Sequence, residues 1–392
     1  MSTGRSIGIL TILNLAGAVL AVVNSVIIAW FFGTSRALEV FFAASTLQML
    51  LFSLTQTGQL AEVFLPTYHR VRQQRGPGAA QVAFAVIANW MVLAVCVLGA
   101  AMWVLAEPLM ALLVPGFETG DRTGAAALFR LLLPLLPLQV AFSLATTLAN
   151  AERRFGLAES ISVISRLGMI VATVALAVPL GASALVAAAY VATGIQILFC
   201  VLVLARMGYR HRLVFACEHF SARGVFARTA TTLGYVGATQ VYAMAFNAAL
   251  SRLPQGTFAV FKYVQTLYAR TNSVLLRPVS VVFFTHFSQA LARGSGDLRR
   301  LVHSALGKSL TLLAPVLAAV AVAGRDVLAG LWGWRSFEPG QLDLAGLLLI
   351  VLLALLLASA LGQIARKTTM SLGMVARQYW TAAGVQLGCA AL

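Results

Sequence analysis

Long apolar runs separated by short polar breaks make up almost the whole chain. The first three runs cover residues 7–32, 41–65 and 82–105, and the pattern continues to the last residue. Each run is about 20 residues or longer, the length that a helix needs to cross a hydrocarbon core of roughly 30 Å. Barrel strands are about half as long and alternate in polarity. The runs therefore predict an all-α polytopic membrane protein.

Composition argues against a soluble or nucleic-acid-binding protein. Hydrophobic residues make up 60% of the 392 positions and charged residues 10%, whereas soluble domains have roughly 25% charged residues. The net charge of +16 is spread over many inter-helix breaks, which argues against a nucleic-acid partner. The four cysteines form no CxxC pair, so neither a disulfide framework nor a metal site is predicted.

About ten complete membrane helices and a partial eleventh are expected. With the N-terminus in the cytoplasm, 18 of the 28 Lys and Arg fall in inner breaks, five in outer breaks and five within helices. Cytoplasmic loops are enriched in Lys and Arg, so the N-terminus is predicted to be cytoplasmic. The chain ends inside the eleventh helix, which leaves open whether it is a truncated fragment. The helices cover residues 7–32, 38–65, 81–105, 124–149, 158–179, 183–206, 227–250, 256–284, 305–323 and 342–364, and the last begins near residue 379.

Two stretches of the sequence resemble each other at an offset of about 219 residues. Residues 38–47, which begin Leu-Glu-Val-Phe-Phe, match residues 258–267, which begin Phe-Ala-Val-Phe-Lys. Six expected helices separate the copies, so both have one orientation, as in transporters built from parallel repeats. We therefore predict an N-terminal lobe (1–215) and a C-terminal lobe (216–392) around a central cavity. The alternative is chance similarity between apolar helices.

The eighth expected helix concentrates charge at membrane depth. It carries Lys262, Arg270 and Arg277, and ionisable groups at that depth usually face a cavity. In a regular α-helix, Arg270 and Arg277 would lie about 20° apart. Three cations without an acid in the same helix suit a pyrophosphate, which Arg can bind through two hydrogen bonds. The alternative is that Lys262 and Arg277 reach the two membrane interfaces.

Weaker polar signals lie in the first two expected helices. Asn24 lies in the first, and Glu39 opens the second, whose later part carries Gln48, Gln56 and Gln59. A polar stripe on an apolar helix suits a cavity wall, and hydrogen bonding between helices is the alternative.

Enzyme signatures are absent from the sequence, so the protein is predicted not to be an enzyme and to need no cofactor. Gly307-Lys308-Ser309 lacks the upstream glycine of a phosphate-binding loop, and the five histidines lie in or beside inner breaks without HExxH spacing. Any active transport would then draw on an ion gradient, the membrane potential or a partner.

Four stretches of the chain are distinctive: the FGTSRALEVFF sequence of residues 32–42, Phe-Leu-Pro at 64–66, Val-Pro-Gly-Phe at 114–117 and residues 131–155. They resemble the MurJ/MviN-type lipid II flippases of the multidrug/oligosaccharidyl-lipid/polysaccharide (MOP) exporter superfamily. The resemblance covers most of residues 1–310. It implies two six-helix lobes around a V-shaped cavity, and movement of an undecaprenyl-pyrophosphate-linked sugar to the outer leaflet.

The chain departs from the charge pattern that this resemblance implies. Two cavity arginines of the family fall on Ala18 and Asn24, and its eighth-helix arginine falls on Thr266, whereas its acidic residue is retained as Glu39. Lys262, Arg270 and Arg277 supply cations elsewhere. The predicted substrate-binding residues are Asn24, Glu39, Lys262, Arg270 and Arg277.

The favoured function is a flippase or exporter for an undecaprenyl-pyrophosphate-linked glycan in the bacterial cytoplasmic (inner) membrane. The departures favour a polysaccharide repeat unit over lipid II itself. The alternative is a cation-coupled drug or metabolite antiporter of the same superfamily; a membrane glycan polymerase would need larger outer loops. The expected partners are the lipid-linked glycan and membrane lipid, with coupling to the membrane potential or an ion gradient, and no oligomeric state is predicted.

Overall fold

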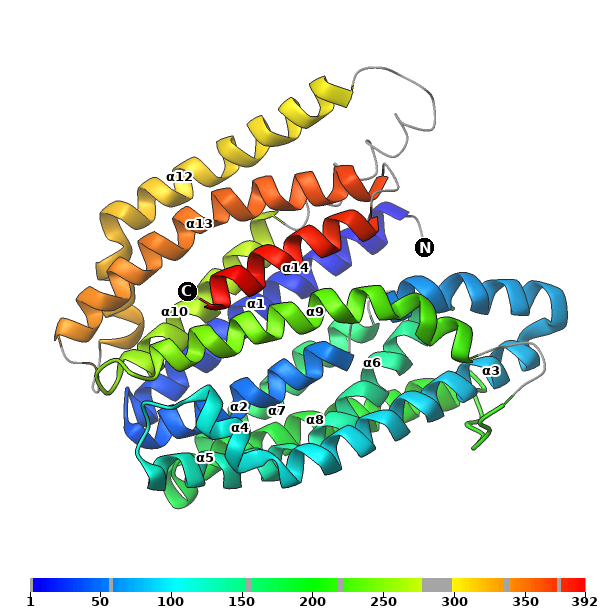
Figure 1. The fold of residues 1–392 in the computed structure, drawn as a ribbon, viewed down its shortest axis with the longest axis horizontal. Coiled ribbons are helices and arrows are strands. Elements are labelled where there is room, and N and C mark those ends of the chain that lie inside the picture. Colours follow the sequence, from blue (N-terminus) through cyan, green and yellow to red (C-terminus); the bar gives the residue numbers. More distant parts are fainter. Residues whose placement is uncertain are drawn as a thin grey trace. The chain divides into compact units, whose positions relative to one another are not determined.

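The computed structural model describes residues 3–55, 59–152, 157–216, 222–276, 298–333, 337, 339–371 and 375–391. Within these segments every regular element is a helix (Figure 1), which confirms the predicted all-α class. The elements are α1 (Thr3–Phe32), α2 (Arg36–Thr55), α3 (Gln59–Val104), α4 (Ala106–Leu113), α5 (Thr119–Leu132), α6 (Leu135–Ala151), α7 (Leu157–Leu180), α8 (Ser183–Arg206), α9 (Ala222–Leu250), α10 (Thr257–Thr271), the π-helical turn η1 (Asn272–Leu276), α12 (Leu298–Trp332), α13 (Pro339–Ser371) and α14 (Val375–Ala391).

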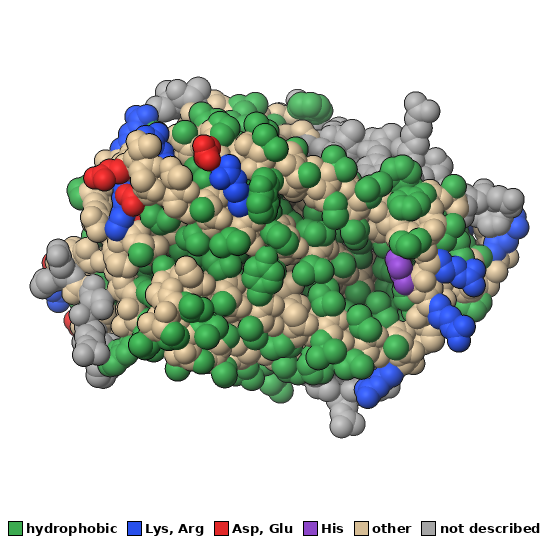
Figure 2. Space-filling view, turned by 90° about the horizontal axis from the view of Figure 1, so that it is seen from below, with side chains coloured by type: hydrophobic (Ala, Val, Ile, Leu, Met, Phe, Trp, Pro, Cys, Tyr) green, Lys and Arg blue, Asp and Glu red, His purple; other side chains and the backbone are tan. Residues whose placement is uncertain are grey.

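Seven helices in the described segments are long and apolar enough to cross a membrane, and α5 with α6 forms an eighth span if this bent pair crosses as one. The chain is therefore a multi-pass membrane protein, as predicted. The expected number of ten spans and a partial one stays a prediction. Figure 2 shows that hydrophobic side chains cover most of the visible face, and that Lys and Arg lie toward its margins.

Several expected helix ranges differ from the structure. The inner break expected at 66–80 is helical, because α3 continues through it and is interrupted only at Gly76, whose φ of 84° a residue without Cβ adopts readily. The single helix expected at 124–149 is two helices, α5 and α6, bent by 42° at a break that contains Pro134. Proline lacks the backbone N–H that a continuous helix needs. The helix expected at 256–284 leaves α-helical geometry at η1.

Contacts between residues divide the chain into two compact units. Unit 1 comprises Met1–Gly17, Val40–Leu253 and Ala383–Leu392, and unit 2 comprises Ala18–Glu39 and Pro254–Ala382. This division differs from the predicted lobes 1–215 and 216–392, which stay a prediction.

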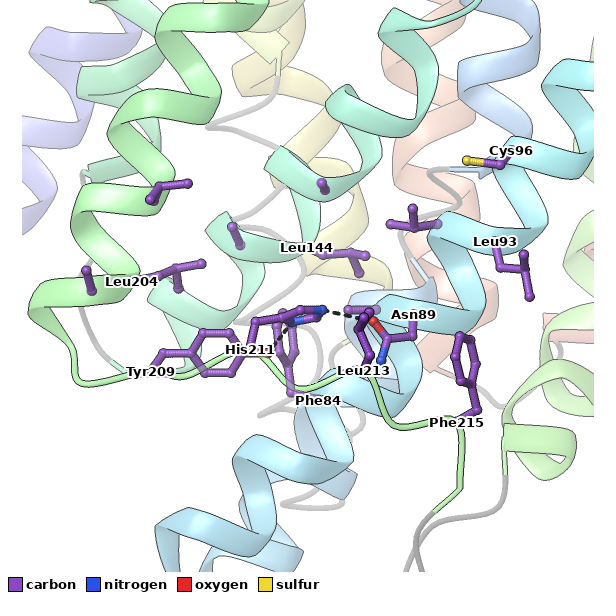
Figure 3. Close-up of a pocket in the computed structure, with 16 residues that line it drawn as sticks. Phe84, Asn89, Leu93, Cys96, Leu144, Leu204, Tyr209, His211, Leu213 and Phe215 are labelled. Carbon is purple, nitrogen blue, oxygen red and sulfur yellow. Dashed lines mark hydrogen bonds between the residues drawn. The ribbon is translucent and has the colours of Figure 1, made fainter.

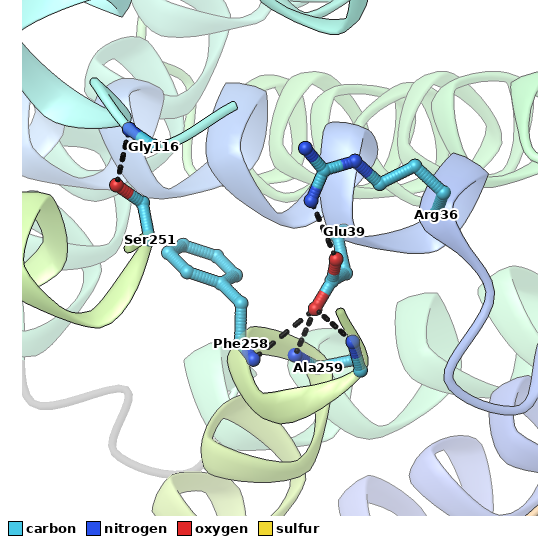
Figure 4. Close-up of polar contacts among 7 residues, drawn as sticks. Arg36, Glu39, Gly116, Ser251, Phe258 and Ala259 are labelled. Atoms are coloured by element: carbon cyan, nitrogen blue, oxygen red, sulfur yellow. Dashed lines mark hydrogen bonds and ion pairs between the residues drawn. The ribbon is translucent and has the colours of Figure 1, made fainter. Parts of the chain in front are cut away.

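In unit 1, α7 lies beside α8, and α6 packs against both α3 and α8 (Figure 1). The Val-Pro-Gly-Phe sequence after α4 approaches the end of α9 closely. The Gly116 backbone N–H donates to Ser251 Oγ at 3.1 Å (Figure 4), and a Cβ at this glycine would lie 2.2 Å from the Ser251 carbonyl oxygen. A larger residue at position 116 would push these two segments apart.

In unit 2, α12 lies beside α13, and α10 packs on α13 (Figure 1). Tyr263 of α10 packs against two rings at the connection between α12 and α13. Its ring centroid lies 5.2 Å from that of Trp332 and 5.6 Å from that of Phe337. Its hydroxyl donates to the Gly33 carbonyl at 2.9 Å. Burial of a tyrosine with its hydroxyl satisfied fixes α10 against both the α1–α2 break and the hairpin.

Candidate functional site

Glu39 binds the N-terminus of α10. Its side chain is 1% exposed, and Oε1 accepts hydrogen bonds from the backbone N–H groups of Gly256, Phe258 and Ala259 at 2.9, 3.1 and 3.3 Å (Figure 4). Oε2 forms an ion pair with Arg36 Nη1 at 2.9 Å. The first N–H groups of a helix have no partner within it and carry partial positive charge. The buried Glu39 carboxylate accepts hydrogen bonds from these N–H groups, and its negative charge compensates their partial positive charge.

Gly256 makes this contact possible. It precedes α10 with φ of 90°, a left-handed conformation that strains any residue with a Cβ. A Cβ there would also lie 2.5 Å from Gln341 Nε2 and 3.4 Å from Thr34 Cβ. These two neighbours are themselves joined, because Thr34 Oγ1 donates to Gln341 Oε1 at 2.8 Å. Only glycine lets the backbone turn its N–H groups toward Glu39 in so tight a space.

The sequence predicted Glu39 as a substrate-binding residue, and the structure places it at this junction between α2 and α10. Both of its carboxylate oxygens are engaged by the chain itself. A ligand that binds the carboxylate would therefore compete with the backbone N–H groups and Arg36 for it. Its binding role stays a prediction.

Lys262 lies on α10, one turn after the residues that Glu39 binds. Its Nζ lies 5.0 Å from the ring centroid of Phe258 and 6.0 Å from that of Phe261. Aromatic faces attract a cation within about 6 Å. This half-buried ammonium is therefore held by rings of its own helix.

Arg270 is half-buried near the end of α10, just before η1. In η1, Asn272 Oδ1 accepts a hydrogen bond from Gln363 Nε2 of α13 at 3.3 Å, and the same nitrogen donates to Ser359 Oγ at 3.2 Å. Gln363 and Ser359 of α13 were not predicted from the sequence. Their spacing of four positions, which puts them on one face of the helix at the end of its long apolar run, was the available signal.

The π-helical turn η1 changes the geometry expected around Arg270. A turn closed by i→i+5 hydrogen bonds is wider than an α-helical turn, so the 20° separation derived for a regular helix does not apply across it. Arg277 lies outside the described residues. Lys262 and Arg270, which both belong to regular α10, are about 80° apart around its axis.

Asn24 of α1 has a buried Oδ1 that accepts no hydrogen bond from the described part of the chain. A buried polar atom without a partner is costly, particularly at membrane depth. This oxygen can accept a hydrogen bond from a ligand hydroxyl or amide. Asn24, Glu39, Lys262 and Arg270 all belong to unit 2.

A second polar cluster lies in unit 1 and was not predicted. Glu152, at the end of α6, accepts a hydrogen bond from the Tyr68 hydroxyl at 2.6 Å and pairs with Arg72 Nη1 at 2.5 Å. Burial raises the pKa of Glu152, but the hydrogen bonds from Tyr68 and Arg72 outweigh this, so that its pKa lies below the ordinary value. The cluster joins the first half of α3 to the end of α6.

Comparisons with known proteins found one matching family model and several solved structures with a similar fold. The family model described as lipid II flippase MurJ matches residues 28–368. None of the curated proteins matches the chain significantly. Among solved structures, lipid II flippase MurJ in an inward closed conformation is 17% identical with a TM-score of 0.79, over 96% of this chain and 78% of that one.

More distant transporters have the same fold. An inward-facing multidrug resistance MATE family transporter of the MOP superfamily is 15% identical with a TM-score of 0.74, over 96% of this chain and 88% of that one. A MOP superfamily transporter from Pyrococcus furiosus is 14% identical with a TM-score of 0.57, over 98% and 93%. At such identities the structural likeness shows the fold alone. The family model spans most of the chain, and the chain therefore belongs to the lipid II flippase MurJ family.

Proposed function

We propose that this protein moves an undecaprenyl-pyrophosphate-linked glycan from the inner to the outer leaflet of a bacterial cytoplasmic membrane by alternating access. Family membership supports a lipid-linked substrate. The observation that carries the proposal is the pair of half-buried cations Lys262 and Arg270 in α10, because neither α10 nor η1 contains Asp or Glu.

The chemistry of these cations suits a diphosphate. A positive charge within a membrane helix is costly and is retained where it serves binding or transport. A guanidinium can donate two parallel hydrogen bonds to phosphate oxygens, whereas an ammonium acts as a compact point charge. Arg270 would bind one phosphate in this way, and Lys262 would add attraction along the same helix. Arg277 is proposed as a third cation.

Neutral polar groups of unit 2 suit the glycan. Asn24 Oδ1 can accept a hydrogen bond from a sugar hydroxyl or amide, because it accepts none from the described residues. The Asn272–Gln363–Ser359 hydrogen bonds of 3.2–3.3 Å can be exchanged for bonds to hydroxyls. Missing family arginines, at Asn24 and Thr266, favour a glycan less charged than lipid II.

The membrane potential provides a driving force for the proposed direction. With the N-terminus in the cytoplasm, as we propose, the anion moves toward the positive outer side. One elementary charge that crosses 100 mV gains about 2.3 kcal/mol. An anionic substrate is therefore driven outward without ATP hydrolysis.

Flipping by purified protein in proteoliposomes tests the proposal. A labelled undecaprenyl-diphosphate glycan is made accessible to an external enzyme only after it crosses the bilayer, and lipid II is assayed beside it. We expect Arg270→Gln and Lys262→Gln to lower the flipping rate at least about tenfold, since each removes a charge-assisted contact. Arg252→Gln, which removes an exposed cation outside α10, should flip like the wild type. Wild-type rates in both α10 variants would refute the proposal.

The alternative, a cation-coupled drug or metabolite antiporter, is less well supported. Such a transporter needs a membrane carboxylate that can bind the coupling cation. Glu39 already uses both oxygens for α10 and Arg36. Sodium- or proton-dependent uptake of a cationic dye in the same vesicles, with no flipping of either glycan, would favour the antiporter instead.

A further inference from the structure

An apolar cavity of about 600 Å³ lies between α3, α6 and α8 of unit 1 (Figure 3). Its volume lies within the roughly 300–1,000 Å³ of pockets that bind small molecules. Leu93, Val201 and Phe215, which line it, are 43%, 59% and 44% exposed. The cavity is therefore open at the surface of unit 1, and a hydrocarbon chain can enter it from the side.

A smaller cavity of about 220 Å³ has a basic lining. Arg210 and Arg212 contribute to it from the segment after α8, and Gly78 and Gln81 contribute from the part of α3 that follows the break at Gly76. Its described lining contains no Asp or Glu. Two exposed guanidinium groups without an acid beside them favour an anion.

One short segment contributes to the lining of both cavities. Tyr209, His211 and Leu213 line the apolar cavity, whereas Arg210 and Arg212 line the basic one. Successive side chains of an extended segment point to opposite sides, and the sequence alternates accordingly. The segment therefore presents an apolar side to one cavity and a cationic side to the other.

The segment is fixed to α3 by side chains that satisfy its backbone carbonyls. Asn89 Nδ2 donates to the carbonyls of Arg212 and Val214, both at 2.9 Å, and Trp90 Nε1 donates to the Phe215 carbonyl at 2.8 Å. Asn89 Oδ1 also lies 2.9 Å from His211 Nε2 (Figure 3). Burial raises the pKa of Tyr209 to about 12, so its phenol is neutral. The segment that lines both cavities is thus held in place before any ligand arrives.

The two linings follow one another along α3. Residues from 78 to 82 line the basic cavity, and residues from 84 to 96 line the apolar one. Twelve residues of helix extend about 18 Å, close to one leaflet of a hydrocarbon core of roughly 30 Å. A basic cavity followed by an apolar cavity about one leaflet long matches the charged headgroup and the acyl chain of a membrane phospholipid.

We propose that these two cavities bind one anionic phospholipid, whose phosphate lies between Arg210 and Arg212 and one of whose acyl chains runs along α3 in the larger cavity. Basic pockets between membrane helices bind anionic headgroups in this manner. The site belongs to unit 1, whereas all the described substrate-binding candidates belong to unit 2. The proposal therefore concerns a lipid other than the transported one.

Native mass spectrometry of the full-length protein in detergent, titrated with single lipids, tests this proposal. We expect one molecule of dioleoyl phosphatidylglycerol to bind about tenfold or more tightly than dioleoyl phosphatidylcholine, given roughly 1 kcal/mol per basic residue near an anionic lipid. The double variant Arg210→Gln/Arg212→Gln should lose this preference. Ala205→Phe, which fills the apolar cavity from an exposed position, should weaken binding of both lipids.

A control for nonspecific attraction is Arg70→Gln/Arg206→Gln, which removes two exposed cations of unit 1 that do not line either cavity. This double variant should keep the preference. Equal binding of the two lipids to the wild type, or the same loss in both double variants, would overturn the proposal. So would displacement of phosphatidylglycerol by an equimolar amount of undecaprenyl diphosphate, because the occupant would then be a polyprenyl lipid. Each result is independent of flipping.

Discussion

The carboxylate of Glu39 lies 2.9 Å from the backbone nitrogen of Gly256, although 217 residues separate the two along the chain. Position 39 also aligns with position 259 in the internal repeat, and Ala259 donates to the same oxygen at 3.3 Å. Equivalent positions of two copies can touch only close to the axis that relates them. A parallel repeat of the two copies would place such a contact near its axis, and the repeat itself stays a prediction.

Removal of this carboxylate should destabilise the protein. Glu39→Ala leaves three buried N–H groups and Arg36 without their acceptor, which should cost at least about 2 kcal/mol of unfolding free energy. Glu39→Gln keeps one acceptor oxygen but loses the charge that favours a helix N-terminus, so its cost should be smaller. Unfolding by SDS in mixed micelles measures both. Glu107→Ala removes an acid whose side chain is 61% exposed and should cost less than about 1 kcal/mol.

Gly256→Ala should be among the most damaging glycine substitutions. Its φ of 90° strains any residue with a Cβ, and a Cβ 2.5 Å from Gln341 Nε2 would force that side chain to move away from Thr34. The left-handed conformation alone costs about 1–2 kcal/mol. Gly99→Ala provides the control, because it lies inside α3 with nothing within 4 Å of its Cβ position, and it should stabilise the helix by roughly 0.5–1 kcal/mol. Equal melting temperatures of the two variants would contradict this interpretation.

Stability should depend on pH through Glu152. Because Tyr68 and Arg72 hold the pKa of this carboxyl below its ordinary value of 4.5, the folded state favours the carboxylate. The contribution is fully present above about pH 4.5, and it is lost as the pH falls through the lower folded pKa. The melting temperatures of the wild type and Glu152→Gln should therefore differ at pH 7 and converge as the pH falls below 4.5. A difference that grows with acidification would have the wrong sign.

Asn24 should matter more for transport than for folding. Since its Oδ1 has no donor among the described residues, Asn24→Leu should leave the melting temperature unchanged or raise it. The flipping rate should nevertheless fall several-fold if this oxygen binds the glycan. Ser25→Ala removes the neighbouring hydroxyl, which bonds only the Val22 carbonyl in the described structure, and should flip normally. Normal flipping by Asn24→Leu would remove it from the site.

The apolar runs predicted the helical class because the membrane leaves few alternatives, and the range expected for 183–206 coincides with α8. The breaks were harder to predict. Charged residues at 70–75 resemble a loop, yet they continue α3 up to a glycine. A loop and a helix at the membrane interface would have the same polar composition at these positions, so hydropathy does not distinguish one from the other.

The candidate site was predicted by residue type and not by contact. Lys262 and Arg270 were identifiable because cations are rare in apolar helices. The contact of Lys262 with the Phe258 ring and the hydrogen bond from Gln363 to Asn272 depend on the three-dimensional structure. The basic and apolar cavities of unit 1 were missed because Asn89 and the carbonyl of Arg212 are 123 residues apart. Such pairs arise from tertiary structure, which a single sequence does not encode locally.

The junction at Glu39 is also asymmetric. The second copy has Ala259 where the first has an acid, so α10 relies on a side chain from elsewhere in the chain for its first N–H groups. At the start of α2, the backbone N–H groups of Leu38 and Glu39 both donate to the Ser35 carbonyl. If the two helix ends separate during transport, the N–H groups of Gly256, Phe258 and Ala259 lose their acceptor, and water or a ligand anion must accept their hydrogen bonds instead.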